Sequence, residues 1–405
     1  MKRKKLLFVC VSLGLGGSER CMAEMLKNLD AQCYDITLQS LIPVENVNAF
    51  PEEIKVINGY EGFAECNAPM REFVPGAAKK GQIIKLLRKS AYWFKVTYGK
   101  CDYTEVFWRT MSKYIPEMQE QFDVTIGYGP GLASLFAMNK VANGGKKILW
   151  VNTNLVRAGF DLKYHHRLYR QTDRIVMVCH NLLRDMQGYY PDCVDKMSVF
   201  YDILDVSGIR AAGNAYQAEY PEEEKNRILT VGRICEAKAL HLAVEAAEIL
   251  KRRGFSFRWY IIGDGELRPQ LEAKINDLDV QDRMVLLGAL RNPYPWFKDC
   301  DLYVQTSVYE GSCTTITEAL IFGKCVVTTD IDIAFEKIEE GKNGLICGMT
   351  GEEIAQKIGI LLENKEYWKQ MQNYISGNPV FCGDDVSLFN QMVNDLCERV
   401  SDNRT

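Results

Sequence analysis

Two glutamates eight positions apart, Glu310 and Glu318, have the spacing in this chain that most strongly suggests chemistry. Glu310 follows a strand-like run and sits on a Glu-Gly turn, whereas Glu318 lies inside an apolar helical pattern. Carboxylates accept hydrogen bonds from sugar hydroxyls, including a ribose diol, and N–H groups at a helix start bind phosphate oxygens. We therefore expect a sugar-nucleotide ligand. The loop and helix start between the glutamates consist of Gly311, Ser312, Cys313, Thr314 and Thr315.

The same two carboxylates could instead serve glycoside hydrolysis, in which an acid and a base flank the scissile bond, and spacing alone leaves both readings open. Two cations favour the diphosphate-bearing ligand. Arg233 ends a strand-like run, and Lys238 follows five residues later at a helix start. Arginine can clamp a diphosphate with its fork and lysine as a point charge. Taken alone, the pair could equally be two ordinary surface residues.

Two glycine-rich loops follow strand-like runs. The first contains Gly16 and Gly17, and the second contains Gly263. Glycine lets the backbone approach a ligand, and the helix N-terminus after such a loop attracts an anion. Neither loop is a G-x-G-x-x-G fingerprint or a Walker loop. A tight structural turn is the alternative reading for both.

Short apolar runs alternate with helical patterns in both halves, which predicts two doubly wound α/β domains with parallel sheets. We expect a first domain over residues 1–204, a second over 205–385, and a final amphipathic helix over 386–405 that packs back on the first domain. The polar segment Asp205–Arg227, with its acidic run at 222–224, is the expected junction. Strands are expected at Leu6–Val11, Val124–Gly127, Ile148–Val151, Ile175–Val178, Ile228–Val231, Phe257–Ile262, Val285–Leu287, Leu302–Gln305 and Val326–Thr329.

Composition is that of a globular protein, with 47% apolar and 25% charged residues. No apolar run approaches the roughly 18 residues that span a bilayer, and we read the basic start Met1–Lys5 as mature protein rather than as a signal peptide. The 14 cysteines include no C-x-x-C pair, which indicates reduced thiols in the cytoplasm. The four histidines are not near cysteine pairs, so we expect no metal site.

Charge is distributed unevenly. Residues 1–203 carry 27 Lys and Arg against 21 Asp and Glu, and residues 204–405 carry 22 against 32. The basic first half could face an anionic acceptor or surface. Within it, residues 79–100 interleave lysines with aromatic and aliphatic residues, a pattern that can lie on an anionic membrane. The alternative is a solvated helix with its apolar side on the core.

Taken together, these features resemble the retaining glycosyltransferases of family 4 over nearly the whole chain. The residues Glu310 to Glu318 match that family's E-x7-E motif, its most specific element. The resemblance also includes the early L-G-x-G-G-S-E-R loop, the V-G-R…K segment at 231–238, the G-x-G turn at 263–265, the G-x-x-V segment at 323–326 and G-K-N-G-L at 341–345. It implies the GT-B fold, in which two Rossmann-like domains face each other across a nucleotide-sugar cleft.

The resemblance also implies roles for individual residues. Arg233 and Lys238 would hold the donor diphosphate, Glu318 the ribose, and Glu310 the transferred sugar, with front-side displacement and retention. The catalytic set would be Glu310, Arg233, Lys238 and Asn152. The donor-binding set would be Gly16, Gly17, Gly263, Gly311, Ser312, Cys313, Thr314, Thr315 and Glu318. The family uses no metal or cofactor, and we discount the D-x-D spacing at 330–332.

Three positions depart from the family pattern. Asn152 stands where members often carry a histidine; it can bind a sugar hydroxyl but cannot titrate near neutral pH. Ala237 and Ala239 replace the usual residues around the lysine, and Cys325 replaces a proline. The first departure bears on substrate preference and rate, and the others look structural.

The sequence thus predicts a cytoplasmic enzyme that binds no nucleic acid, and it leaves open whether the enzyme is peripheral at the inner face of the cell membrane. It would transfer a sugar from a nucleotide donor, most often UDP-linked, to a glycan or lipid-linked acceptor in surface-polysaccharide assembly. The alternatives are a GT-B hydrolase, phosphorylase or epimerase, and a non-catalytic nucleotide-sugar-binding protein.

Overall fold

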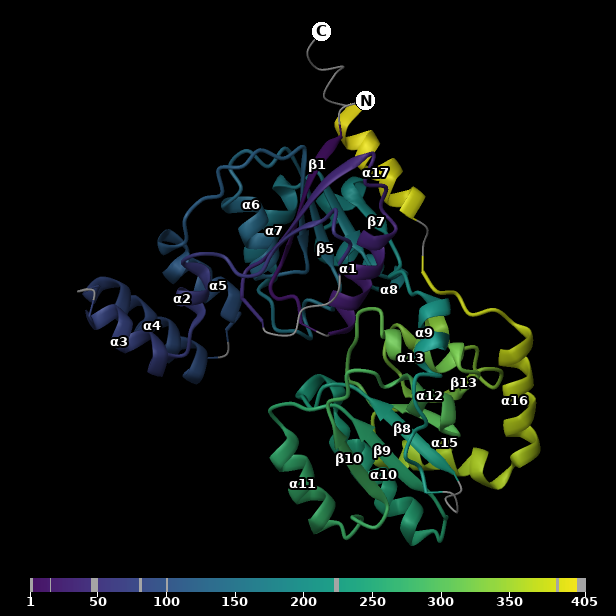
Figure 1. The fold of residues 1–405 in the computed structure, drawn as a ribbon. Helices are drawn as coiled ribbons and strands as arrows, with labels where there is room; N and C mark the ends of the chain where they lie inside the picture. The colour runs from purple at the N-terminus through teal and green to yellow at the C-terminus, as the bar shows by residue number, and fades with distance from the viewer. Residues whose placement is uncertain are drawn as a thin grey trace. The chain divides into compact units, whose positions relative to one another are not determined.

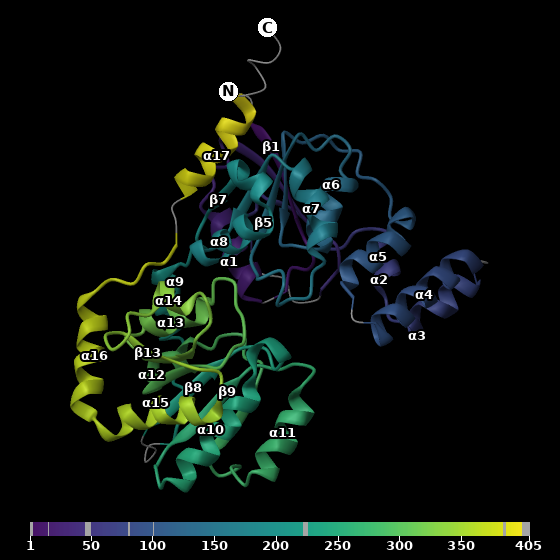
Figure 2. The same cartoon turned by 180° about the vertical axis from the view of Figure 1, so that it is seen from behind.

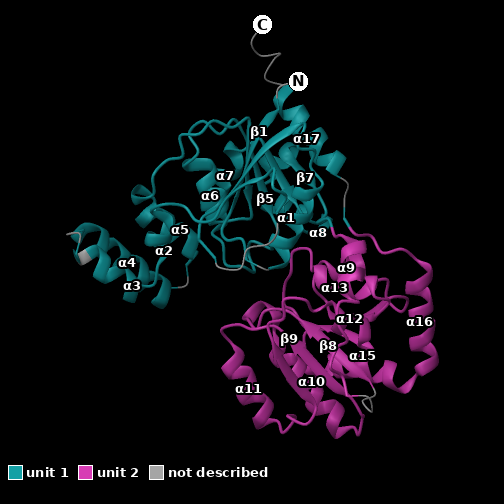
Figure 3. Ribbon diagram, in the orientation of Figure 1, with its two compact units in different colours: residues 1–203, 383–405 teal, residues 204–382 magenta. Residues whose placement is uncertain are grey.

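The chain forms two compact units, which Figure 3 shows in different colours. The computed structural model describes residues 3–14, 16–44, 50–79, 82–99, 101–221, 226–383 and 386–398. The first unit is Met1–Ile203 with Gly383–Thr405, and the second is Leu204–Cys382. The segment Asp205–Arg227, expected as a junction, belongs to the second unit and begins with helix α9 (Val206–Ala212). Its acidic run at 222–224 lies outside the described residues.

The first unit is built on a parallel sheet in the order β3-β2-β1-β4-β5-β6-β7 (Figure 1). Its inner strands are almost fully buried, which is why they read as continuous apolar runs. The strands are β1 (Lys4–Cys10), β2 (Tyr34–Ser40), β3 (Lys55–Ile57), β4 (Val124–Tyr128), β5 (Lys146–Val151), β6 (Arg174–Met177) and β7 (Met197–Val199).

Helices lie around this sheet, as the opposite view in Figure 2 also shows. Aspartates start two of them: Asp102 accepts backbone N–H groups at the start of α5, and Asp161 does so at the start of α7. The helical elements are α1 (Gly17–Lys27), α2 (Phe63–Asn67), α3 (Met70–Lys79), α4 (Ile83–Tyr98), α5 (Tyr103–Met111), η1 (Ser112–Tyr114), α6 (Leu132–Asn139), α7 (Leu162–Gln171), α8 (His180–Tyr189), η2 (Pro191–Lys196) and α17 (Val386–Glu398).

Helix α17 returns from the end of the chain to the first unit. Its Phe389 ring lies 5.9 Å from that of Phe8 on β1, centroid to centroid. The ammonium of Lys4 donates to the amide oxygen of Asn394. These contacts explain why the amphipathic tail is ordered as a helix, because its apolar face is buried on β1.

The second unit repeats the design with a parallel sheet in the order β10-β9-β8-β11-β12-β13. Its strands are β8 (Arg227–Val231), β9 (Arg258–Ile262), β10 (Met284–Gly288), β11 (Leu302–Gln305), β12 (Cys325–Thr329) and β13 (Gly344–Cys347). Its helical elements, after α9, are η3 (Glu236–Lys238), α10 (Leu240–Arg252), α11 (Arg268–Asp277), α12 (Tyr294–Asp299), α13 (Thr314–Ile321), α14 (Ala334–Lys337), α15 (Gly351–Glu363) and α16 (Lys365–Gly377).

Each sheet reverses its strand order once. In the first unit the reversal lies between β1 and β4, and in the second between β8 and β11. Connections leave in opposite directions at such a point, so a crevice opens beyond the carboxyl ends of the two strands. The loops after β1, β4, β8 and β11 are therefore the places where the fold positions a ligand.

Candidate active site

The loop after β8 carries Gly232 and Arg233 and lies against the loop after β9. The Gly232 N–H donates to the carbonyl oxygen of Ile262 at 2.9 Å. Gly263 has a φ of +146°, and a Cβ there would lie 1.9 Å from the carbonyl oxygen of Gly232. Position 263 therefore accepts only glycine, because the backbone of the neighbouring loop fills the space. This close approach fixes the point at which Arg233 leaves the sheet.

Arg233 is exposed at this edge. Its backbone carbonyl accepts the Cys235 N–H at 2.9 Å, which turns the chain toward η3. Within the described ranges, no side chain pairs with its guanidinium. A planar, permanently charged group without a protein partner is suited to bidentate contact with a phosphate.

Lys238 and Glu310 form an ion pair at the point where the sheet reverses. The Lys238 Nζ lies 2.5 Å from Oε1 of Glu310, and the two side chains are 18% and 14% exposed. Burial alone would lower the pKa of Lys238. The charge of Glu310 and its hydrogen bond outweigh that effect, so the pKa of Lys238 lies above its usual value. The lysine is therefore a cation throughout the physiological pH range.

The Glu310 carboxylate is held by one of its two oxygens. Oε1 also accepts the Ser307 hydroxyl at 2.5 Å and the Gln305 amide at 3.2 Å. The Gln305 amide oxygen in turn accepts the Tyr303 hydroxyl at 2.6 Å, which fixes the amide's orientation. Among the described residues, none hydrogen-bonds the other oxygen, Oε2. Oε2 can therefore accept a hydrogen bond from a ligand hydroxyl.

Backbone contacts hold η3 against the loop that carries Glu310. The Thr306 hydroxyl donates to the carbonyl oxygen of Lys238 at 2.8 Å, and the Val308 N–H donates to that of Ala237 at 2.8 Å. Ala239, next in the chain, has a left-handed backbone with φ of +44°. Glycine adopts this conformation without strain, whereas a Cβ there costs about 1–2 kcal/mol.

The five residues before and at the start of α13 form a compact polar turn. Gly311 and Cys313 are buried, and Ser312, Thr314 and Thr315 are half-buried. Cys313 precedes the helix in a left-handed conformation, with φ of +45° and no side-chain cap for the helix. Burial and the nearby Glu310 raise the pKa of its thiol to about 11, so it stays uncharged. The helix start therefore offers backbone N–H groups beside a neutral side chain.

Glu318 lies on α13 and is only 4% exposed. One of its oxygens accepts the hydroxyl of Tyr294 on α12 at 3.2 Å. Lys337 on α14 donates to the carbonyl oxygen of Cys313 at 3.3 Å and to the Thr317 hydroxyl at 2.7 Å. The sequence analysis missed Tyr294 and Lys337, because neither lies in a motif and only the fold brings them to α13.

In the first unit, the glycine loop and Asn152 come together. Gly16 precedes α1, which begins at Gly17, and Leu15 lies outside the described residues. The Asn152 amide, which follows β5, donates to the Ser18 hydroxyl at 2.6 Å. The sequence analysis missed Ser18, although it follows the glycines directly. This edge of the first unit thus presents glycine backbone, a hydroxyl and an amide.

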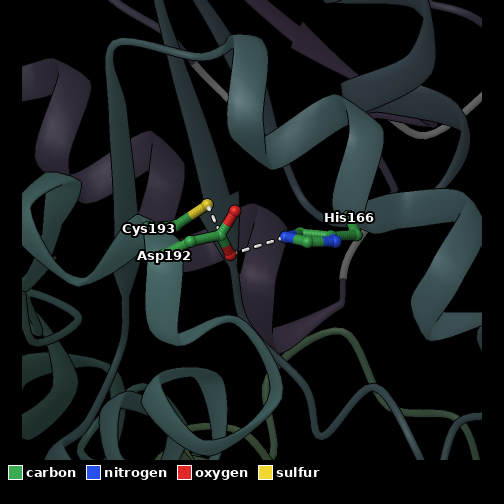
Figure 4. A group of neighbouring side chains, drawn as sticks. All are labelled: His166, Asp192 and Cys193. Atoms are coloured by element: carbon green, nitrogen blue, oxygen red, sulfur yellow. Dashed lines mark hydrogen bonds and ion pairs between the residues drawn. The ribbon is translucent and has the colours of Figure 1, made fainter.

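One group of potential metal ligands occurs among the described residues: His166, Asp192 and Cys193 (Figure 4). The sequence gave no sign of this proximity. Asp192 is already bonded to His166 at 2.7 Å and to Arg170 at 3.3 Å. Burial, followed by the charge of Asp192, raises the pKa of the Cys193 thiol and disfavours the thiolate that a metal needs. We therefore read Asp192 as a partner of His166 and Arg170 rather than as a metal ligand.

The class of protein follows from this geometry and from comparison with solved structures. Two Rossmann-like units, each with site residues at the carboxyl ends of its strands, define the GT-B fold. The chain superposes on Anabaena HepE, solved in complex with UDP-glucose, with a TM-score of 0.64 and 16% sequence identity over 98% of this chain and 100% of that one. At this identity the likeness shows the fold alone.

The second unit also matches a known family model. Residues 214–377 match the model described as glycosyl transferases group 1. The predicted resemblance to glycosyltransferases is thereby confirmed at the level of group 1.

Relatives extend the likeness to most of the chain. One relative is the N-acetylgalactosamine-N,N'-diacetylbacillosaminyl-diphospho-undecaprenol 4-alpha-N-acetylgalactosaminyltransferase of Campylobacter jejuni. This chain is 24% identical to it over 372 residues, and the match covers 91% of this chain and 93% of that protein. A match to an uncharacterized glycosyltransferase of Methanocaldococcus jannaschii, 24% identical over 201 residues, covers 47% of this chain and 50% of that protein.

Proposed function

We propose that this protein is a retaining glycosyltransferase of family 4 that transfers a sugar from a UDP-sugar to a glycan or lipid-linked acceptor in surface-polysaccharide biosynthesis. The observation that carries the proposal is the half-buried Lys238–Glu310 pair at the strand-order reversal of the unit that matches the group 1 model. It combines a permanent cation for a diphosphate with a carboxylate that keeps one oxygen for a sugar hydroxyl.

Donor binding follows from the chemistry of the individual groups. Arg233 and Lys238 would neutralise the diphosphate, with N–H groups of Gly17 and of the turn at 311–315 as further donors. Glu318 would accept hydrogen bonds from the ribose diol, and the Tyr294 hydroxyl would orient its carboxylate. Gly16 and Gly263 would let the backbone pass close to the donor, and Asn152 would bind a sugar hydroxyl.

In the proposed reaction, the acceptor oxygen bonds to the anomeric carbon on the face from which the diphosphate leaves. The bond between that carbon and the phosphate oxygen breaks, and the acceptor proton passes to the departing phosphate. The products are an α-linked glycoside and UDP. Negative charge grows on the leaving diphosphate, and Arg233 and Lys238 would stabilise it, so the reaction would need neither metal nor cofactor.

The donor and acceptor are proposed from the relatives. Anabaena HepE was solved with UDP-glucose, which supports UDP as the nucleotide. The name of the Campylobacter relative specifies transfer to a sugar on diphospho-undecaprenol, which supports a lipid-linked acceptor. All 14 cysteines are free thiols, consistent with work in the reducing cytoplasm.

Calorimetric titration of the purified protein with UDP, GDP and ADP tests this proposal. We expect micromolar binding of UDP, weakened at least tenfold (about 1.4 kcal/mol) by Arg233→Ala. Arg252→Ala is the matched control, because Arg252 is an exposed arginine of the same unit at the far end of α10. Binding of no nucleotide, or equal binding by Arg233→Ala, would contradict the site assignment and favour a non-catalytic or phosphorylase-type protein.

A further inference from the structure

Helix α4 lies in the most basic stretch of the chain. Residues 73–101 contain seven Lys and Arg and no Asp or Glu. The sequence pattern left two readings open for residues 79–100: contact with an anionic membrane, or a solvated helix with its apolar side on the core. Lys80 and Lys100 lie outside the described residues, but the structure shows how α4 itself is oriented.

Two lysines of α4 face inward, contrary to the reading in which its apolar side packs on the core. Lys85 and Lys89 are 6% and 3% exposed. The Lys85 ammonium lies 3.1 Å from Oε2 of Glu65, and Lys89 donates to the carbonyl oxygen of Cys66 at 2.5 Å. Both ammonium groups also lie within 5.7 Å of the Phe73 ring centroid. Their long apolar stems and these partners make the basic side of the helix its buried side.

The opposite side of α4 is apolar and exposed. At about 100° per residue, the five most exposed apolar side chains of α4 fall within an arc of roughly 100° that excludes both buried lysines. Arg88 and Lys95 border this arc on one side. We call this surface the apolar face of α4; its members, each 61–69% exposed, are Ile83, Ile84, Leu87, Phe94 and Tyr98.

The position of α4 leaves this face uncovered within the first unit. Helix α4 packs on α3 and α5, and Figures 1 and 2 show α3 and α4 on the outside, with α2 and α5 between them and the sheet. Trp93, 46% exposed, and Phe94 both pack edge-on or tilted against Tyr98. An exposed apolar patch of this kind on a folded unit marks an interaction site.

We propose that the apolar face of α4 docks on an anionic lipid surface. Its aliphatic and aromatic side chains would enter the boundary between headgroups and acyl chains, and Arg88 and Lys95 would contact the anionic headgroups. The positive charges of Arg88 and Lys95 favour an anionic lipid surface over a second copy of the chain. A second copy of the chain would bring the same cations together with no acidic residue between 73 and 101 to offset them.

The proposed docking is in the plane of the surface. No helix among the described residues is long and apolar enough to cross a membrane. A helix that is apolar on one side, with cations at the border, lies along the interface instead.

Vesicle co-sedimentation of the full chain tests the proposal without any donor or acceptor, so its outcome is independent of the catalytic proposal. The vesicles would contain phosphatidylcholine alone or an equal mixture with phosphatidylglycerol. The variants would be Leu87→Glu and Phe94→Glu. The matched control is Phe381→Glu, because Phe381 in the second unit has the same 61% exposure as Phe94 and undergoes the same change.

We expect binding to the mixed vesicles, a loss of at least tenfold (about 1.4 kcal/mol) in both α4 variants, and no loss in the control. Circular dichroism would confirm that the variants fold, as expected for exposed positions. No binding by the wild type, or equal binding by the α4 variants, would overturn the proposal. A wild-type dimer that Leu87→Glu separates, without vesicle binding, would assign the face to a second copy.

Discussion

Lys238 is half-buried and Lys89 is buried, and the two lysines lie in regions with different tasks. Lys238 meets the Glu310 carboxylate, which raises its pKa above the usual value. Lys89 meets a carbonyl oxygen and aromatic rings rather than a carboxylate, and burial lowers its pKa to about 8. A formal negative charge offsets the desolvation of an ammonium, whereas a carbonyl dipole does not. The comparison shows that the site of Lys238 keeps an ammonium group charged. The site of Lys89, on the side of α4 opposite its apolar face, instead lowers the pKa of an ammonium group.

The largest expected effect is on Lys238. Replacing Lys238 by methionine removes the cation proposed to stabilise the leaving diphosphate and leaves Glu310 without its ion-pair partner. We expect kcat to fall by about 10³-fold, roughly 4 kcal/mol. Steady-state kinetics with a UDP-sugar would measure it. Lys357→Met, which breaks a partly exposed pair with Glu340, is the control and should retain activity. Near-normal kcat in Lys238→Met would remove Lys238 from the mechanism.

A second substitution, Glu310→Gln, should give Lys238 a lowered pKa like that of Lys89. In Glu310→Gln the charge that offsets burial is gone, so the pKa of Lys238 should fall below its usual value. We expect UDP affinity in this variant to decline as pH rises from about 7 to about 9.5, by up to about tenfold (1.4 kcal/mol). The wild-type affinity should change little because its Lys238 stays protonated.

Calorimetry at several pH values in a buffer of constant ionic strength would measure this difference. The same pH profile in both proteins would show that Glu310 does not set the protonation of Lys238.

The smallest effect concerns Lys89 and stability. The folded protein holds a proton on Lys89 less tightly than the unfolded chain does, so between a pKa of about 8 and the unfolded value of about 10.4 the unfolded chain binds more protons. The contribution of Lys89 to stability therefore rises with pH across this window. Lys89→Met should lack that rise.

Urea unfolding of both proteins at either end of the window would measure it. Comparing the pH slopes cancels other groups that titrate there, such as Lys147, whose pKa burial also lowers to about 8. Parallel slopes in wild type and variant would contradict the lowered pKa of Lys89.

The sequence predicted much of the fold because buried parallel strands leave continuous apolar runs. All nine expected strands are present; β11 has the expected bounds, and the ends of the other eight shift by one or more residues. The strands β2, β3, β7 and β13 were not predicted. β3 and β7 are three residues long, and none of their residues is buried, so they carry no apolar signature.

Part of the site could also be predicted, because its residues lie in short motifs beside strands and helix starts. Such motifs gave Arg233, Lys238, Glu310 and Glu318, but not the contacts among them. The sequence could not show that Oε1 of Glu310 collects Lys238, Ser307 and Gln305, since these residues are up to 72 positions apart. Tyr294, Lys337 and Ser18 were missed for the same reason.

The sequence by itself determined that two doubly wound halves exist and that carboxylates and cations follow particular strands, because local period and spacing set these features. Only the tertiary structure decided the direction in which side chains point. The sequence shows that helix α4 has a basic side and an apolar side, but it does not show which side is buried. Lysine side chains are usually exposed. Here the buried lysines contact Glu65, the Cys66 carbonyl and the Phe73 ring. The apolar side of α4 is therefore exposed. Burial depends on the partners that the fold supplies.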